Sequence, residues 1–218
     1  MCALYRNPLI SGFTTNPTLM KKAGISDYET FARDVLRSIP DRPISFEVFS
    51  DDFSEMEDQA RKIAGWGENV YAKIPVTNTC GCSSAHLIRR LSESGVRLNI
   101  TALMTVKQVR EVRDAMETCP SGYISVFAGR IADTGRDPVP IMREAVKELS
   151  DTPHLELIWA SPRELLNIFQ ADAIGCHVIT ATGDILSKLH LVDKDLDEYS
   201  LDTVKMFRDD AVKAGFSI

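Results

Sequence analysis

Short apolar runs alternate with amphipathic stretches along almost the whole chain of 218 residues. Each run is about as long as a β-strand and is rich in Ile, Val, Leu or Phe on both faces, which is typical of a parallel sheet buried beneath helices. The strands that this pattern predicts are Leu9–Thr14, Ile44–Phe49, Val70–Val76, Leu98–Leu103, Tyr123–Ala128, Leu155–Ala160 and His177–Ala181.

Helical patterns lie between these runs and carry start and stop signals. The segment Asp27–Ser38 has apolar residues at helical spacing and ends before Pro40, and Ser83–Ser94 ends at Gly95. Because no linker, repeat or low-complexity stretch divides the chain, we expect one domain over residues 1–218 with a helical tail over about 190–218. The other helices predicted are Asp52–Trp66, Val106–Glu117, Pro140–Leu149, Pro162–Phe169 and Leu201–Ala214.

The order of strands and helices predicts right-handed crossovers and a parallel sheet, either open or closed into a barrel. Polar residues gather toward the carboxyl ends of many strands, which is expected of the top face of a barrel, whereas an open sheet uses its switch point. A G-x-G-x-x-G or Walker loop is absent from the sequence. The residues concerned are Asn16, Glu47, Lys73, Asn99, Thr101, Ser125 and Arg163.

The sequence therefore predicts an α/β fold, a TIM-type (β/α)8 barrel. The pattern supplies seven strand–helix pairs, and a closed barrel of this kind has eight. The segment Cys2–Asn7 resembles the end of a helix that leads into the first predicted strand. We therefore expect the first strand, rather than an internal one, to be missing from this chain.

Composition narrows the classes of partner. The net charge of −6 and the pI near 5.3 argue against nucleic acid and anionic membranes, which need a basic surface. Five cysteines, an odd number and without paired metal-ligand spacing, indicate free thiols in a reducing cytoplasm. The sequence has neither an apolar run of membrane-spanning length nor a signal-peptide pattern over Met1–Arg6, so a cytoplasmic location is expected.

Lys73, in the predicted strand Val70–Val76, is the strongest single candidate for chemistry. A lysine in a buried strand is rare unless it is paired or functional. Burial favours the neutral amine, which is the form that attacks a carbonyl carbon. Pairing with Glu47 at the barrel rim is the structural alternative.

Polar residues on neighbouring strands would surround this lysine. Glu47 could orient a water or hold a proton in transfer, although a salt bridge explains a carboxylate in a strand about as well. Asn99 and Thr101 alternate with apolar residues, so both side chains point to one face, the expected barrel interior. Buried polar groups need partners, which either a polyhydroxylated ligand or other interior groups would supply.

Two arginines follow predicted strands and could hold an anionic group. Arg130 comes shortly after Ser125, and Arg163 lies at a strand-to-helix turn, where backbone N–H groups and a guanidinium together favour phosphate. Ordinary surface arginines remain the alternative. Asn16 precedes Pro17, and a turn explains this pair as well as a ligand contact does.

Together these segments resemble the transaldolase family, in the short-chain subgroup that includes enzymes like fructose-6-phosphate aldolase. The resemblance extends from about Leu9 to Leu189; each motif is weak alone, and all of them in this order are specific. The motifs are Thr14-Thr15-Asn16-Pro17, Lys73-Ile74-Pro75, Asn99-Ile100-Thr101, Ser125 with Gly129-Arg130-Ile131, and Ala160-Ser161-Pro162-Arg163.

The resemblance implies an eight-stranded barrel and a class I aldol mechanism that uses neither a metal nor an organic cofactor. Lys73 would attack the keto group of a ketose phosphate such as fructose 6-phosphate, and the iminium would take up electrons as the C3–C4 bond breaks. The dihydroxyacetone unit would stay on Lys73 until an aldehyde such as erythrose 4-phosphate accepts it.

The resemblance also implies a role for each matching position. Glu47 and Thr101 match the pair that positions a catalytic water, and Arg130 and Arg163 match the phosphate binders. Sugar phosphates are the expected partners. A homo-oligomer is also expected, because the C-terminal helix in this subgroup often packs on a neighbouring subunit; packing on its own barrel is the alternative. The positions that match substrate-binding residues are Asn16, Asn99 and Ser125.

One departure from the family concerns a proton-relaying aspartate on its first strand. That strand would precede Tyr5, and no Asp occurs before Asp27. We expect a shortened version of a complete enzyme rather than an impaired, sugar-phosphate-binding homologue. A lyase that releases free dihydroxyacetone is the other alternative. The sequence leaves open the acceptor aldose, and whether the enzyme serves pentose-phosphate metabolism or a dedicated pathway.

Overall fold

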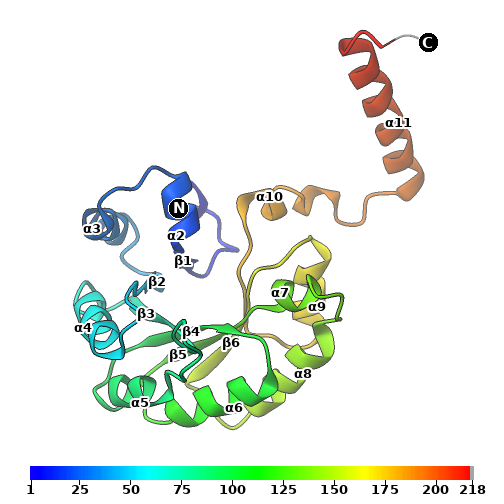
Figure 1. Ribbon diagram of the computed structural model, residues 1–218. Helices are drawn as coiled ribbons and strands as arrows, with labels where there is room; N and C mark the ends of the chain where they lie inside the picture. The colour runs from blue at the N-terminus through cyan, green and yellow to red at the C-terminus, as the bar shows by residue number, and fades with distance from the viewer. Residues whose placement is uncertain (217–218) are drawn as a thin grey trace. The chain divides into compact units, whose positions relative to one another are not determined.

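The computed structural model describes residues 1–216 and contains two compact units, Met1–Ala181 and the segment from Thr182 onward. The first unit is built on a seven-stranded parallel sheet whose strands are hydrogen-bonded in chain order (Figure 1). The strands are β1 (Phe13–Thr14), β2 (Ile44–Glu47), β3 (Val70–Pro75), β4 (Leu98–Leu103), β5 (Gly122–Val126), β6 (Leu155–Trp159) and β7 (Val178–Ile179).

Helices follow the strands and cover one face of this sheet. In Figure 1, α4, α5, α6 and α8 lie along the outer side of the curved sheet. The alternation of strand and helix therefore gives a half-barrel, which confirms the predicted α/β class and is consistent with a TIM-type barrel. The helices of this unit are α1 (Cys2–Tyr5), α2 (Pro17–Lys22), α3 (Tyr28–Ser38), α4 (Phe53–Ala64), α5 (Ala85–Glu93), α6 (Val106–Ala115), α7 (Ala128–Ala132), α8 (Val139–Glu148) and α9 (Leu166–Ala173).

The two faces of the sheet differ in chemistry because strand side chains alternate. The face beneath the helices is apolar and fully buried, with Phe46, Ile74, Ile100, Ile124 and Trp159 among its members. Burial of such side chains is the main stabilising contribution to this unit. The opposite, inner face is polar over the central strands, as the next subsection describes.

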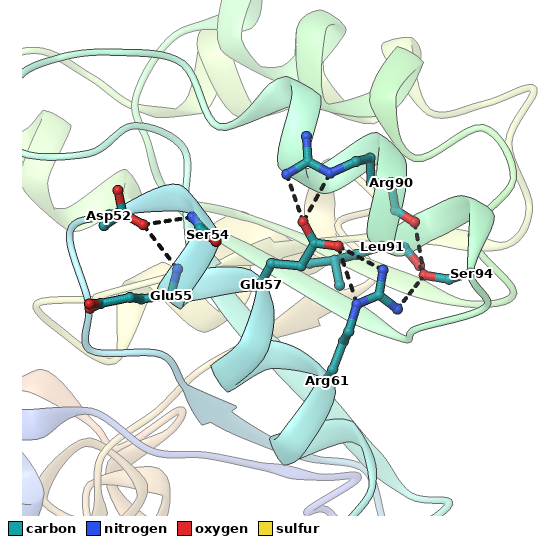
Figure 2. A network of polar contacts seen from close by, with 8 residues as sticks. All are labelled: Asp52, Ser54, Glu55, Glu57, Arg61, Arg90, Leu91 and Ser94. Atoms are coloured by element: carbon teal, nitrogen blue, oxygen red, sulfur yellow. Dashed lines mark hydrogen bonds and ion pairs between the residues drawn. The ribbon is translucent and has the colours of Figure 1, made fainter.

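Charged and capping residues on the outer helices fix their position. Asp52 accepts hydrogen bonds from the N–H groups of Ser54 and Glu55 at the start of α4. One turn further, Glu57 pairs with Arg61 on its own helix and with Arg90 on α5, both at 2.7 Å (Figure 2). The network therefore ties α4 to α5 on the outside of the sheet.

Several element boundaries differ from the sequence prediction. Leu9 is 74% exposed, and its N–H donates to the side chain of Asn7, so the first strand starts at Phe13. The chain after Val126 bends at once into α7 rather than extending the strand. Helix α9 begins at Leu166 rather than at Pro162.

The second unit consists of the short helix α10 (Gly183–Leu186), a 3-10 turn at Leu189–Leu191 and the long helix α11 (Leu196–Lys213). Asp195 caps α11 by accepting a hydrogen bond from the N–H of Glu198. No residue of α11 is buried, and the apolar side chains of Leu201, Val204 and Phe207 are exposed. The predicted C-terminal helix is thus present and starts five residues earlier than expected, at 196 instead of 201.

Within residues 1–216, every helix is too short or too polar to cross a lipid bilayer.

Candidate functional site

Lys73 lies in the middle of β3 on the polar inner face, and its exposed fraction is 8%. Its ammonium group donates to the main-chain carbonyl of Thr15 at 2.9 Å and contacts Oε2 of Glu47 at 3.3 Å. A buried cation of this kind needs such acceptors, because desolvation otherwise makes the charge costly. The contact with Glu47, which the sequence offered as the structural alternative to a catalytic role, is therefore present.

Strand register brings the candidate side chains into neighbouring positions. Glu47 on β2 pairs with Lys73 on β3, and Lys73 pairs with Asn99 on β4. Residues paired in this way point to the same face of a sheet. Glu47, Lys73 and Asn99 therefore share the inner face of the sheet, the face on which strand alternation places Asn99 and Thr101.

Asn99 is fully buried and is held at both ends of its side-chain amide. Its Nδ2 donates to Oγ of Ser45 at 2.9 Å, and its Oδ1 accepts from Oγ of Ser125 at 2.8 Å. This Ser45–Asn99–Ser125 chain crosses from β2 to β5. Ser45 is a member of the site that sequence reasoning missed, because a serine in an apolar run carries no pattern of its own.

Thr101 is buried two residues further along β4, and its hydroxyl donates to the carbonyl of Ile74 at 3.4 Å. The next residue, Ala102, has φ of 65°, and the pairing of β4 with β5 shifts between Ile100 and Leu103. A left-handed alanine is uncommon and marks a bulge that redirects the end of a strand. The bulge therefore begins directly after Thr101.

Tyr28 and Thr15 complete the surroundings of Lys73; the sequence gave Tyr28 no role and Thr15 none beyond its place in the Thr14-Thr15-Asn16-Pro17 motif. The N–H of Glu47 donates to the hydroxyl of Tyr28 at 2.6 Å, and the same hydroxyl lies 3.4 Å from Oγ1 of Thr15. The Tyr28 ring packs edge-on against Phe46 at a centroid distance of 6.0 Å. Burial raises the pKa of Tyr28, so the phenol stays protonated.

Asn16 lies next to Thr15 and caps a helix that the sequence did not predict. Its Oδ1 accepts from the N–H of Leu19 at 2.7 Å, and Pro17 occupies the first position of α2. The Asn-Pro pair, interpreted as a turn or a ligand contact, thus starts a helix, as proline at the first helical position allows. The amide nitrogen of Asn16 is the end that the cap leaves for other partners.

The two arginines follow β5 and β6, and both act electrostatically on Asp133. Arg163 forms a bidentate pair with Asp133 through Nε at 2.9 Å and Nη2. This pair lowers the pKa of Asp133, with a smaller contribution from Arg130, and raises the pKa of Arg163. Both arginines are exposed. The sequence pointed to the arginines but gave no reason to single out Asp133.

A close backbone approach joins the two loops that carry these arginines. A Cβ on Gly129 would lie 1.6 Å from the carbonyl oxygen of Ser161, so glycine is required there. Ser161 has φ of 60°, which is uncommon for a serine. The side chain of Asn167 accepts from the N–H groups of Arg163 and Glu164, which explains why α9 starts later than predicted.

Across residues 1–216, no three His, Cys, Asp or Glu side chains lie close enough together to hold a metal ion. The arrangement instead joins a buried amine, a carboxylate and a chain of hydroxyl and amide groups on one face of a curled parallel sheet. Amines in such surroundings can attack carbonyl carbons. Fold and site together define an α/β half-barrel with a buried lysine at its centre.

The sequence model described as Transaldolase/Fructose-6-phosphate aldolase matches residues 1–218, so the chain belongs to this family of enzymes. The resemblance identified from the five motifs is thereby confirmed.

Curated relatives agree with this assignment. A probable transaldolase of Dehalococcoides mccartyi is 34% identical over 182 residues, which are 83% of this chain and 81% of the relative. "Probable transaldolase 2" of Listeria monocytogenes is 33% identical over 89% of this chain and 86% of its own. A probable transaldolase of Thermoanaerobacter is 32% identical over 96% of this chain and 91% of the relative. A mandelate oxidase structure matches at 15% identity and a TM-score of 0.48 over 68% of this chain and 50% of that one, too weakly to support an inference.

Proposed function

We propose that this enzyme transfers a dihydroxyacetone unit from a ketose phosphate to an aldose phosphate through a Schiff base on Lys73. The observation that carries the proposal is the buried Lys73 amine, held between the Thr15 carbonyl and the Glu47 carboxylate. Nucleophilic amines in class I aldol chemistry need partial desolvation and a neighbouring proton carrier, and both are present in this arrangement.

The steps balance with groups from this chain. The Lys73 nitrogen adds to the keto carbon of fructose 6-phosphate, water leaves, and an iminium forms. The C4 hydroxyl gives its proton to Glu47, and the C3–C4 electrons flow into the iminium as a three-carbon aldose phosphate departs. The enamine left on Lys73 adds to the acceptor aldehyde, whose oxygen takes the proton from Glu47, and water then releases the longer ketose phosphate. Glu47, with Thr101, would orient that water and carry its protons.

The binding groups proposed are those implied by the resemblance to the family. We assign Asn16, Asn99 and Ser125 to the sugar hydroxyls and Arg130 and Arg163 to the phosphate. Arg163 is held by Asp133, so a phosphate would share or replace that carboxylate. Five free cysteines fit a reducing compartment such as the cytoplasm, which is part of the proposal.

A homo-oligomer is also proposed, with α11 as the packing element. Leu201, Val204 and Phe207 are exposed apolar residues on this helix, and apolar surface of this kind is usually covered in an assembly. Light scattering should give a mass above that of one 24.2 kDa chain, and Phe207→Asp should lower it. A monomeric wild-type protein at micromolar concentration would remove this part of the proposal.

The test of the activity compares two incubations. With fructose 6-phosphate and erythrose 4-phosphate together, we expect a seven-carbon ketose phosphate and a three-carbon aldose phosphate in equal amounts. With fructose 6-phosphate alone, we expect little turnover. Steady release of free dihydroxyacetone without an acceptor would instead identify an aldolase-type lyase.

A further inference from the structure

The parallel ladder between β1 and β2 is interrupted at the residues that contact Lys73. Phe13 pairs with Ile44 and Thr14 with Ser45, and the ladder continues as the N–H of Thr15 donates to the Ser45 carbonyl at 3.1 Å. In a parallel ladder the next bond runs from the N–H of Glu47 to the carbonyl of Thr15.

Both groups of that next bond have exchanged partners. The N–H of Glu47 donates to the hydroxyl of Tyr28 at 2.6 Å, and the carbonyl of Thr15 accepts from Nζ of Lys73 at 2.9 Å. A backbone N–H buried without an acceptor is costly, and so is a buried ammonium without acceptors. The Glu47 N–H and the Thr15 carbonyl thus do not bond to each other: the tyrosine hydroxyl is the acceptor for the N–H, and the lysine amine is the donor to the carbonyl.

We propose that Tyr28 is a positioning residue: its hydroxyl caps the N–H of Glu47, which keeps the Thr15 carbonyl free to hold the Lys73 amine. This inference rests on the proposed function, because Tyr28 would position the lysine that the proposed reaction uses as its nucleophile. Tyr28 does not contact Lys73 and acts through Glu47 and Thr15.

Hydrogen-bond donors and acceptors around the tyrosine are consistent with this role. The Thr15 hydroxyl has one proton, which it donates to the Ser45 carbonyl at 3.0 Å. In the 3.4 Å contact between Tyr28 and Thr15, the phenol is therefore the donor. One hydroxyl accepts from Glu47 and donates to Thr15, the two residues whose other groups contact Lys73.

The position of the ring is fixed independently of the hydroxyl. Tyr28 packs edge-on against Phe49 at 4.7 Å and Trp66 at 5.8 Å between ring centroids, so phenylalanine can take its place. Tyr28→Phe then removes the hydroxyl, with its contacts to Glu47 and Thr15, and keeps the packing of the ring. The Glu47 N–H would turn to the Thr15 carbonyl and close the ladder, and Lys73 would lose one of its two acceptors.

The test measures two properties of Tyr28→Phe beside wild type and Tyr5→Phe. The control removes an exposed hydroxyl that donates to Asp41 at 2.6 Å. The first property is how the effect of the substitution on the transfer reaction divides between kcat and KM. The second is the rate of reductive methylation of Lys73 by formaldehyde and cyanoborohydride, measured by peptide mass spectrometry relative to the exposed Lys107.

We expect kcat of Tyr28→Phe to fall about tenfold with KM changed less, and methylation of Lys73 to rise about threefold or more, because the amine loses an acceptor. Tyr5→Phe should match wild type in both. Unchanged Lys73 methylation in Tyr28→Phe would overturn the inference, whatever the effect on kcat. Methylation needs no sugar, so it decides the role of Tyr28 even if the wild-type enzyme fails the transfer assay, which would refute the proposed function separately.

A second variant covers the case in which Tyr28→Phe does not fold. Thr15→Val keeps the carbonyl that holds Lys73 but removes the hydroxyl that receives the Tyr28 proton. The same increase in Lys73 methylation, at smaller amplitude, is expected. Methylation equal to wild type in folded Thr15→Val would count against the inference.

Discussion

Glu47 and Lys73 occupy paired positions on neighbouring parallel strands, and their side chains meet 3.3 Å apart on the polar inner face of the sheet. The side-chain exposed fractions are 18% for Glu47 and 10% for Lys73, so the pair is screened only weakly by solvent. The account of the activity depends on this contact, and the first two predictions address its two partners.

Replacing Lys73 with arginine should preserve charge and fold but abolish activity. Arginine stays protonated and cannot form an imine with a ketone. We expect kcat to fall by about three orders of magnitude or more. A steady-state transfer assay measures this loss, and circular dichroism with thermal melting checks the fold. If the Lys73→Arg variant retained a tenth of the wild-type activity, Lys73 would be excluded as the nucleophile.

Glu47→Gln keeps the shape of the side chain but removes its proton-carrying capacity. We expect kcat to fall about 100-fold or more, the usual scale for a lost acid–base group. The control is Glu93→Gln, an exposed position on the outer helix α5. Equal rates for both variants would show that Glu47 serves as a structural partner of Lys73.

Arg163 should distinguish phosphorylated from unphosphorylated substrates. Arg163→Ala is expected to raise KM for fructose 6-phosphate by about 10- to 100-fold, because a bidentate charged contact is lost, and to leave KM for unphosphorylated fructose nearly unchanged. Asp133→Asn, which removes the competing carboxylate, should lower KM for the phosphorylated sugar. Equal increases in KM for both donors would show that the phosphate group binds elsewhere than at Arg163.

Gly129 should tolerate no side chain. In Gly129→Ala the new Cβ would overlap the Ser161 carbonyl oxygen, so the loops carrying Arg130 and Arg163 must separate. We expect the free energy of unfolding to fall by roughly 3 kcal/mol. Gly183→Ala, where the structure leaves open space around the added carbon, should change it by less than about 0.5 kcal/mol. Urea unfolding of both variants provides the comparison.

The Glu57 network should contribute stability in a pH-dependent way. Hydrogen bonds from Arg61 and Arg90 lower the pKa of Glu57 below its ordinary value. Its contribution is therefore present above the ordinary glutamate pKa and is lost as pH falls through the lowered value. Because both arginines are about half exposed, we expect Glu57→Gln to lower Tm by about 2–4 °C at pH 7. The difference in Tm should shrink as pH falls through the lowered pKa of Glu57, and a difference that stays constant as pH falls would contradict this explanation.

The parts of the site that the sequence predicted share one property: a polar side chain stands out against an apolar strand. Lys73, Glu47 and Asn99 are of this kind, although strand periodicity placed only Asn99 and Thr101 on one face and the register of the sheet adds Lys73 and Glu47. The two arginines were found because they follow strands. The same reasoning predicted the parallel sheet, because strands that are apolar on both faces are typical of a parallel sheet covered by helices.

The parts that the sequence could not reveal depend on contacts distant in the chain. Tyr28 lies on the apolar side of a helical pattern, where an aromatic residue normally means core packing. Thr15 acts through its main-chain carbonyl, which every residue possesses. Asp133 becomes notable when the fold brings it within reach of Arg163, 30 residues later. Such partners follow from three-dimensional packing, which residue types and spacing do not encode directly.

The most direct test of the central claim is borohydride trapping of the enzyme with fructose 6-phosphate, followed by intact-mass and peptide mass spectrometry. The account predicts a reduced three-carbon adduct on Lys73 and none in Lys73→Arg. A six-carbon adduct on Lys73 would support the imine but contradict efficient C–C cleavage by this chain. Absence of any adduct, or an adduct on another lysine, would contradict the claim that Lys73 forms the Schiff base.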